Sequence, residues 1–195
     1  MGREFELKFA ANEAVLAAIE GKFGCFECIS METTYFDTPD RALSARHITF
    51  RRRMENGVSV CTLKTPAKGL GRGEWDTECD TIEDAIPELC KLSEHPLLPI
   101  LLAPGVEPVC GAKFLRKAKT VLLPDCVVEI ALDQGVLTGG GRVLPLCEVE
   151  VELKSGSEEA AVAFAKTLAA EFSLQPESKS KFQRASQVAE EKFNT

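Results

Sequence analysis

Two segments far apart in the sequence alternate charged with apolar side chains, and this alternation constrains the fold more than any other feature. In residues 4–9 the charged side chains occupy every second position, namely Glu4, Glu6 and Lys8. In residues 148–153 the alternating charges are all acidic: Glu148, Glu150 and Glu152. Because successive side chains of a β-strand point to opposite faces, each segment is expected to form a strand with one charged face and one apolar face.

Basic side chains follow the same alternation in other predicted strands. Residues 48–53 place Arg51 and Arg53 on one face, and Arg52 on the opposite face. Further strands are expected within residues 58–64, 72–78, 114–122 and 127–133, and their charged positions include Lys64, Arg72, Glu74, Arg116, Glu129 and Asp133. The predicted sheet therefore carries charge along one face of nearly every strand.

Two arrangements satisfy these charged faces. In a sandwich of two sheets, the apolar faces point inward and the charges point to solvent. In a closed barrel with helices packed outside, the charges line the interior. Mixed rows of glutamate, arginine and lysine at this density favour the barrel, with a cation site that faces bound anions across a polar lumen.

Helices are expected between the strands, at residues 12–19, 81–92, 157–172 and 181–193. Asn12 and Ser157 suit the N-cap position, where a side-chain oxygen accepts a hydrogen bond from a free backbone N–H. Pro87 predicts a break or a new start within the second helix, because proline lacks an N–H group. The triple glycine at residues 139–141 is expected to turn a hairpin.

Composition is typical of an intracellular protein with one domain. The chain has 195 residues, enough for a single domain spanning residues 1–195 with a sizeable core, and its net charge of −7 argues against nucleic-acid binding. We find no membrane-spanning stretch and no signal peptide, and expect a cytoplasmic protein. The scattered cysteines indicate small buried hydrophobic residues rather than disulfides, notably Cys61, Cys79, Cys126 and Cys147.

The ordered set of motifs resembles that of the CYTH superfamily, the triphosphate tunnel metalloenzymes. The motifs are Glu4-x-Glu-x-Lys8, Arg51-x-Arg53, Thr62-Leu-Lys64, Arg72-x-Glu74, Phe114-Leu-Arg116, the stretch from Glu129 to Asp133, the glutamate row from Glu148 to Glu152, and Ser180-Lys-x-x-Arg184. The last motif and the stretch from Glu129 are most similar to the bacterial inorganic triphosphatase branch. The resemblance implies an α+β fold, in which an eight-stranded antiparallel β-barrel forms a tunnel with helices packed outside.

The resemblance also implies roles for the charged residues, with a small-molecule triphosphate as substrate and Mg²⁺ or Mn²⁺ as cofactor. The catalytic candidates are Lys8, Glu4 and Glu6, and Lys8 would contact a phosphate or orient the attacking water. The metal-ligand candidates are Glu4, Glu6, Glu148, Glu150 and Glu152. Phosphates would be bound by Lys8, Arg51, Arg53, Lys64, Arg116, Lys181 and Arg184. Supporting positions in the tunnel are Arg72, Glu74, Glu129 and Asp133.

Other functions stay open at this level. Within the same superfamily the alternatives are thiamine-triphosphate hydrolysis and a class IV-type adenylate cyclase, and both require a place for an organic group. A third alternative is a module that binds polyphosphate or nucleotide without turnover. The acidic rows disfavour that module, because anion binding alone needs no carboxylates. The sequence leaves the oligomeric state undetermined.

Overall fold

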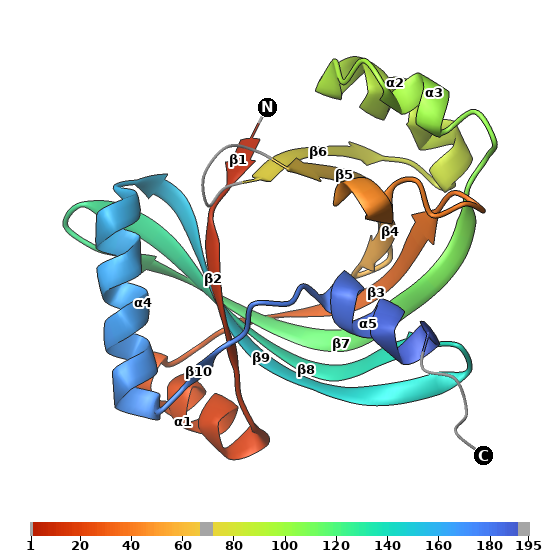
Figure 1. The fold of residues 1–195 in the computed structure, drawn as a ribbon. Coiled ribbons are helices and arrows are strands. Elements are labelled where there is room, and N and C mark those ends of the chain that lie inside the picture. The colour runs from red at the N-terminus through yellow and green to blue at the C-terminus, as the bar shows by residue number, and fades with distance from the viewer. Residues whose placement is uncertain (1, 67–71, 191–195) are drawn as a thin grey trace.

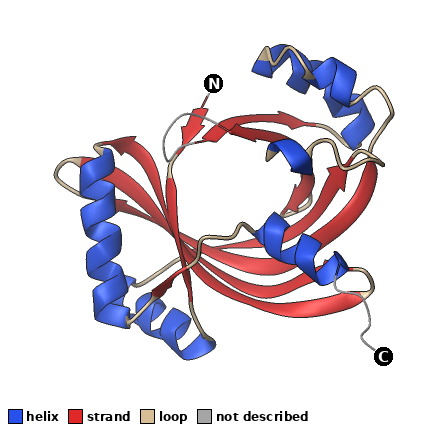
Figure 2. Ribbon diagram, in the orientation of Figure 1, coloured by secondary structure: helices blue, strands red, loops and turns tan. Residues whose placement is uncertain are grey.

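The computed structural model describes residues 2–66 and 72–190, and its centre is a strongly curved antiparallel sheet (Figure 1). Within these residues ten strands follow the spatial order β1 (Gly2–Glu4), β6 (Arg72–Glu78), β5 (Val58–Pro66), β4 (Thr49–Glu55), β3 (Glu27–Asp37), β7 (Glu107–Leu122), β8 (Cys126–Gly139), β9 (Arg142–Gly156), β2 (Glu6–Ala10) and β10 (Gln175–Pro176). The strands surround a central opening, and the helices lie outside the ring or across its mouth (Figure 2).

The N-terminal strands connect the two ends of the sheet. Glu4 in β1 lies opposite Arg72 in β6, whereas Glu6 in β2 lies opposite Glu152 in β9. Between them, the carbonyl of Phe5 accepts a hydrogen bond of 2.9 Å from the backbone N–H of Leu153. The ring is therefore completed by the continuous chain through Phe5, and no ladder of hydrogen bonds closes it within the described strands.

The predicted tunnel fold is confirmed, but the strand count differs from the expected eight. The first predicted strand is divided at Phe5 into β1 and β2, because its two halves pair with different neighbours. The two-residue strand β10 adds to the free edge of β2. The sequence pattern shows the alternation of faces, but it does not show a change of partner within one alternating segment.

Two helices cover the outer face of the sheet beside the N-terminal strands (Figure 1). They are α1 (Glu13–Phe23) and α4 (Glu158–Phe172), with Asn12 and Ser157 as their N-caps, as predicted. Ile19 of α1 and Leu168 of α4 pack in one buried cluster with Val151 of β9. This apolar cluster holds the outward faces of the strands whose inward faces carry the glutamates.

A second apolar cluster lies under α2 (Ile82–Ser93) and α3 (Leu98–Leu101). Leu89 and Leu98 pack there against Phe50 of β4. The break predicted at Pro87 is wrong, because α2 continues through it. The helix keeps its N-cap at Thr81 and its buried contacts, which outweigh the single backbone hydrogen bond that proline cannot make. No helix of the described chain is long and apolar enough to cross a membrane.

A third cluster holds α5 (Lys181–Glu190) across one mouth of the ring, where the ring of Phe182 lies 5.2 Å from that of Tyr35. The start of this helix matches the prediction, and residues 191–193 lie outside the described part. The hairpin after β8 turns at Gly140 and Gly141, as predicted. A Cβ atom on Gly139 would lie 2.5 Å from the Ala185 carbonyl, so glycine permits the close approach of α5.

The cysteines are all free thiols. Of the four expected to be buried, Cys61 and Cys126 are buried and Cys79 and Cys147 are half-buried. Burial raises the pKa of the Cys61 thiol to about 11, as expected for a cysteine that acts as a small hydrophobic side chain.

Candidate active site

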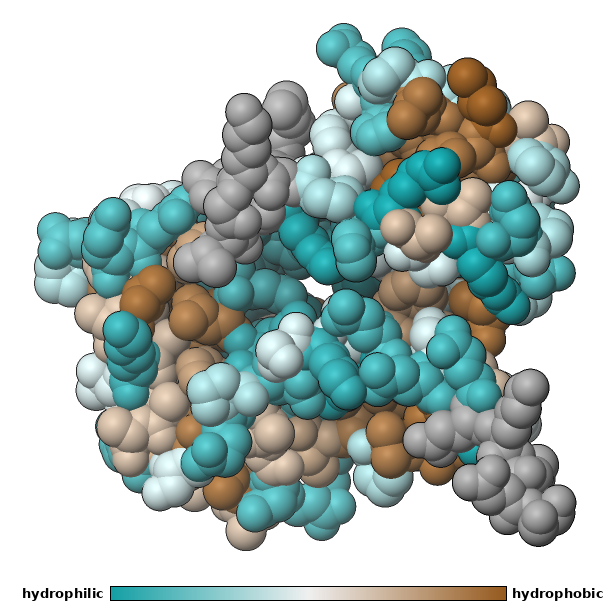
Figure 3. Space-filling view, viewed as in Figure 1, coloured by the Kyte–Doolittle hydropathy of each residue, from teal (hydrophilic) through white to brown (hydrophobic). Residues whose placement is uncertain are grey.

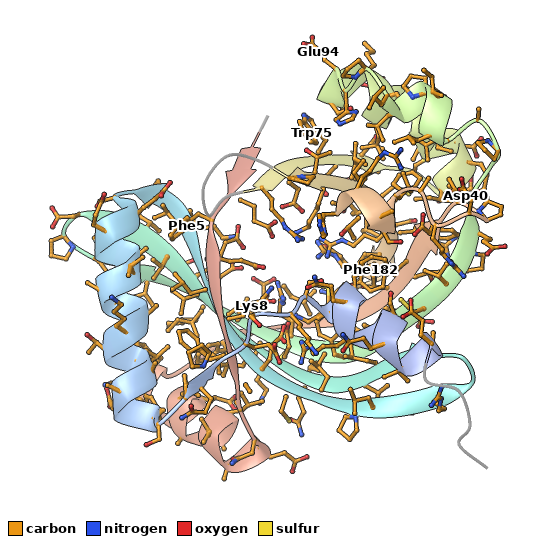
Figure 4. The ribbon with its side chains drawn as sticks, in the orientation of Figure 1. Phe5, Lys8, Asp40, Trp75, Glu94 and Phe182 are labelled. Carbon is orange, nitrogen blue, oxygen red and sulfur yellow. The ribbon has the colours of Figure 1, made fainter. Side chains whose placement is uncertain are left out.

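The ring of strands encloses a cavity of about 380 Å³, and most side chains that line it are charged. Hydrophilic side chains surround its opening (Figure 3), and side chains with nitrogen and oxygen atoms point into the ring beside Phe182 (Figure 4). The structure brings together here these residues of the predicted site: Glu4, Glu6, Lys8, Arg51, Arg53, Lys64, Arg72, Glu74, Arg116, Glu129, Glu150, Glu152 and Lys181.

Three predicted site residues lie behind the wall of this cavity instead. Asp133 and Glu148 are fully buried, and Arg184 contacts Glu148. They belong to a cluster of ion pairs between the sheet and α5. Alternation places Asp133 and Glu148 near the tunnel, and the family resemblance places Arg184 there, but neither reveals that α5 covers this part of the sheet.

A row of three carboxylates crosses the inner face of the sheet. Glu6 of β2 lies opposite Glu152 of β9, and Glu152 lies opposite Glu129 of β8. Lys154 is the cation closest to this row, with its Nζ 2.8 Å from Glu152 and 3.4 Å from Glu129. Like charges on directly opposed residues of a sheet repel one another, so the row favours an added cation.

Glu6 shows the effect of this repulsion. Burial raises the pKa of Glu6 to about 7, and the nearby carboxylates of Glu150 and Glu4 add to the rise. Lys64 and Lys8 oppose it, and Lys8 Nζ lies 3.5 Å from Glu6 Oε1. Lys64 is more closely engaged with Glu4, at 2.5 Å. Near neutral pH, Glu6 is thus incompletely compensated by the side chains around it.

A basic wall stands on β4 and β5. Arg51 and Arg53 both line the cavity, and each has a buried Nε group without a hydrogen-bond partner. Arg51 lies 3.5 Å from Glu74, and Arg53 pairs with Glu55. Burial lowers the pKa of Arg53, and the neighbouring guanidinium of Arg51 lowers it further. Unsatisfied donors and neighbouring like charges are the properties expected of a site that binds an anion.

A second group of carboxylates is formed by Asp133, Glu148 and Glu150, whose ligand oxygens lie within 4.8 Å of one another. Lys181 Nζ lies 2.7 Å from Asp133 and 2.8 Å from Glu150, and it also contacts Glu148. Arg116 pairs with Asp133 and Glu150, and Arg184 pairs with Glu148.

Glu150 in this second group is compensated by the protein's own cations, whereas burial beside Glu150 raises the pKa of Glu148 to about 7. Although burial opposes the charged form, Lys181 and Arg116 hold the pKa of Glu150 well below its usual range. Asp133, Glu150 and Glu148 likewise raise the pKa of Lys181 against the effect of burial. A metal ion at this position would have to displace the Lys181 ammonium, so the group fits a metal less well than the row of Glu6, Glu152 and Glu129.

Several lining residues were not among the predicted site residues. Asp76, Glu55 and Lys154 alternate with the other inward-facing residues of β6, β4 and β9. The sequence pattern could therefore have predicted that they line the cavity. Tyr35 is an inward residue of β3, whereas Phe182 comes from α5. No periodic pattern marks Phe182, because its position depends on how α5 packs across the mouth.

Comparisons with known proteins agree with this geometry. The sequence matches the family model of the CYTH domain over residues 2–186. It is 31% identical to an inorganic triphosphatase of Haemophilus influenzae over 206 residues, which include this whole chain and 57% of that protein. The chain thus spans a little over half the length of this curated relative.

Solved structures show the same fold at low sequence identity. A candidate adenylyl cyclase from Hippeastrum, described as having a dominant triphosphatase activity, has a TM-score of 0.68 and 15% identity, over 95% of this chain and 96% of that one. A candidate adenylate cyclase from Bacillus halodurans has a TM-score of 0.66 and 17% identity, over 94% of this chain and 98% of that one.

Proposed function

The chain belongs to the CYTH domain family, and we propose that it is a divalent-metal-dependent hydrolase of inorganic triphosphate. The observation that carries the proposal is one cavity with a carboxylate row on β2, β9 and β8 and a basic wall on β4 and β5. The inorganic triphosphatase activity named for the Haemophilus influenzae relative supports the same reaction.

The carboxylate row has the donor chemistry that a divalent cation requires. Mg²⁺ and Mn²⁺ prefer oxygen ligands, and Glu6, Glu152 and Glu129 offer them with too few basic neighbours. We propose these residues as the principal ligands, with Glu4 and Glu150 close enough to raise the pKa of Glu6. A bound metal would orient the polyphosphate and lower the pKa of the attacking water.

The basic wall would hold the phosphate oxygens. Arg51 and Arg53 present free Nε donors, and Lys64 lies on the neighbouring strand β5. Arg116 and Lys181 line the cavity from another side and are fixed by Asp133. We assign Glu148 and Arg184 to anchoring α5, because they pair with each other and Glu148 also contacts Lys181, whereas the second partner of Arg184 is Glu177, at 3.9 Å.

In the proposed reaction a water oxygen bonds to a terminal phosphorus. The bond from that phosphorus to the bridging oxygen breaks, pyrophosphate leaves with the electron pair, and the proton of the water passes to the medium. Lys8 lies beside Glu6 and opposite Glu150, where it would contact the terminal phosphate or orient the water. The basic wall disperses the charge that develops on the phosphate oxygens.

A phosphate-release panel tests the proposal. Triphosphate, pyrophosphate, ATP and thiamine triphosphate are incubated with the protein, with Mg²⁺ or Mn²⁺ and with excess chelator. We expect inorganic triphosphate to be cleaved fastest, and chelator to abolish the cleavage. Undiminished cleavage in chelator contradicts the metal dependence, and no cleavage of triphosphate with either ion contradicts the hydrolase. Release of phosphate from none of the four compounds would leave the binding module as the better assignment.

A further inference from the structure

A second cavity, of about 390 Å³, adjoins the tunnel, and residues of α5 line it. It lies between α5 and the segment of residues 37–49. Four residues line both cavities: Thr49, Arg72, Ser180 and Phe182. The two cavities are therefore neighbours, and their shared lining includes the cationic side chain of Arg72.

The charges of the second cavity favour an anion. Arg41, Arg72 and Lys179 contribute cationic groups, whereas Asp37 and Glu190 are its acidic residues. Asp37 is fully buried, and its carboxylate accepts hydrogen bonds from the backbone N–H groups of residues 38, 43 and 44, at 2.8, 3.0 and 3.2 Å. The oxygens of Asp37 are thus engaged by backbone N–H groups of the turn that follows it. The remaining charged residues of the lining are three cations and one carboxylate, Glu190.

Two of these cations are weakly engaged. Lys179 Nζ donates to the neutral amide of Gln187, at 3.0 Å. Arg41 lies 3.6 Å from Glu107, and about half of each side chain is exposed. Exposed pairs of this kind contribute little free energy, so Arg41 can exchange its partner for a ligand at small cost.

We propose that the second cavity is a binding subsite for the phosphates beyond the third in a linear polyphosphate whose first three phosphates occupy the tunnel. The inference rests on the proposed function, because it places triphosphate in the tunnel. The cations that favour phosphate in the tunnel continue into the second cavity through Arg72. Ser186 and Gln187 add uncharged groups that can donate hydrogen bonds to phosphate oxygens.

Calorimetric titration tests the subsite without turnover. Triphosphate, tetraphosphate and ATP are titrated into the metal-free protein in chelator, at physiological ionic strength to screen distant charges. Wild-type protein is expected to bind tetraphosphate roughly tenfold more tightly than triphosphate, because the fourth phosphate would add one charge-assisted hydrogen bond in the second cavity. The Arg41→Glu/Lys179→Glu variant should lose this gain and change the dissociation constant of triphosphate less than about twofold.

The matched control is Lys91→Glu/Lys166→Glu, which makes the same charge change on the exposed surfaces of α2 and α4. It should retain the wild-type preference for tetraphosphate. Equal affinity of wild-type protein for the two anions, or equal losses for both in the Arg41/Lys179 variant, would overturn the proposal. A gain confined to ATP would assign the cavity to an organic group instead. Phosphate release is measured separately, so failure of the hydrolase assignment does not alter this binding ratio.

Discussion

Asp133 and Arg116 form a bidentate ion pair between neighbouring strands, in which Arg116 Nε lies 2.8 Å from Asp133 Oδ1 and Arg116 Nη2 lies 2.7 Å from Asp133 Oδ2. The same Oδ2 atom lies 2.7 Å from Lys181 Nζ on α5. One buried carboxylate therefore fixes a cation of the sheet and a cation of the helix that crosses its mouth.

Replacement of this carboxylate should destabilise the fold. Asp133→Asn leaves two cations without their shared partner, and breaking a buried ion pair typically costs roughly 3–5 kcal/mol. Urea denaturation measures the loss, with Glu32→Gln as control. Glu32 pairs with Lys113 on the exposed outer face, so its loss should stay below about 1 kcal/mol. Equal losses of unfolding free energy in Asp133→Asn and Glu32→Gln would show that the buried ion pairs stabilise the fold no more than an exposed pair does.

Arg53→Ala should weaken the stabilisation by triphosphate. A ligand at 100 times its dissociation constant adds about 2.7 kcal/mol to the free energy of unfolding, and a tenfold weaker affinity removes about 1.4 kcal/mol of that gain. The control is Arg52→Ala, because Arg52 faces outward on the same strand and donates to the Asp80 carbonyl at 2.9 Å. If thermal denaturation shows the full ligand effect in Arg53→Ala, the basic wall does not bind the substrate.

Glu6→Gln should reduce turnover of triphosphate by at least roughly 100-fold, because it removes a proposed ligand of the metal. The metal-free variant should fold normally, since one of several mutually repelling carboxylates is gone. Phosphate release at saturating Mg²⁺ measures the effect, and Glu32→Gln again serves as the outer-face control. Near-normal turnover in Glu6→Gln would show that Glu6 is not a required ligand of the metal.

The stability of the metal-free protein should fall as pH rises from about 5 to about 7.5. Burial raises the pKa of Glu6 from its ordinary value of 4.5 to about 7 in the folded protein, so between these values the folded state binds more protons than the unfolded state. Stability then decreases with rising pH. Burial beside Glu150 raises the pKa of Glu148 to about 7 and acts in the same direction. Urea denaturation in chelator should show a flatter profile for Glu6→Gln, and an unchanged profile would contradict the prediction.

The products formed from ATP separate the hydrolase from a cyclase. A cyclase must hold the ribose so that its 3′-hydroxyl attacks the α-phosphate, whereas the proposed hydrolase admits water to a terminal phosphorus. With Mg²⁺ or Mn²⁺ we expect slow release of phosphate from ATP and little or no cyclic AMP. Mass spectrometry identifies the products, and cyclic AMP as the main product would refute the hydrolase assignment.

The alternation of charged residues was sufficient to predict which side chains share a face of each strand, because side-chain parity is a local property of strands. The choice of a tunnel over a sandwich rested on the resemblance to the CYTH superfamily. Arg51 and Arg53 line the cavity while Arg52 lies outside, as their positions in the sequence indicate. Parity also placed Glu148 with the other glutamates on the inner face of β9. It did not predict that Glu148 is buried away from the cavity. Glu148 is fully buried against Lys181 and Arg184, and this contact depends on the packing of α5.

The sequence pattern likewise did not predict that the carboxylates form two groups, a row with few cations nearby and a buried group paired with lysine and arginine. Glu129 and Asp133 lie on the same face of β8 and differ only in the cations that reach them. Asp133 contacts Arg116 and Lys181, whereas Glu129 faces Glu152 and a single lysine. Strand register and helix docking decide these partners, and both arise from contacts between residues far apart in the chain.

The division of the first strand between two partners has a consequence for the order of assembly. Residues 6–10 are synthesised well before residues 148–152, which form their partner strand in the ladder. Pairing at such sequence separation requires the closure of a long loop, which slows folding. Strand β2 must therefore stay unpaired on that side until residues 148–152 have emerged, so we expect the ring to close after the strands between them have formed.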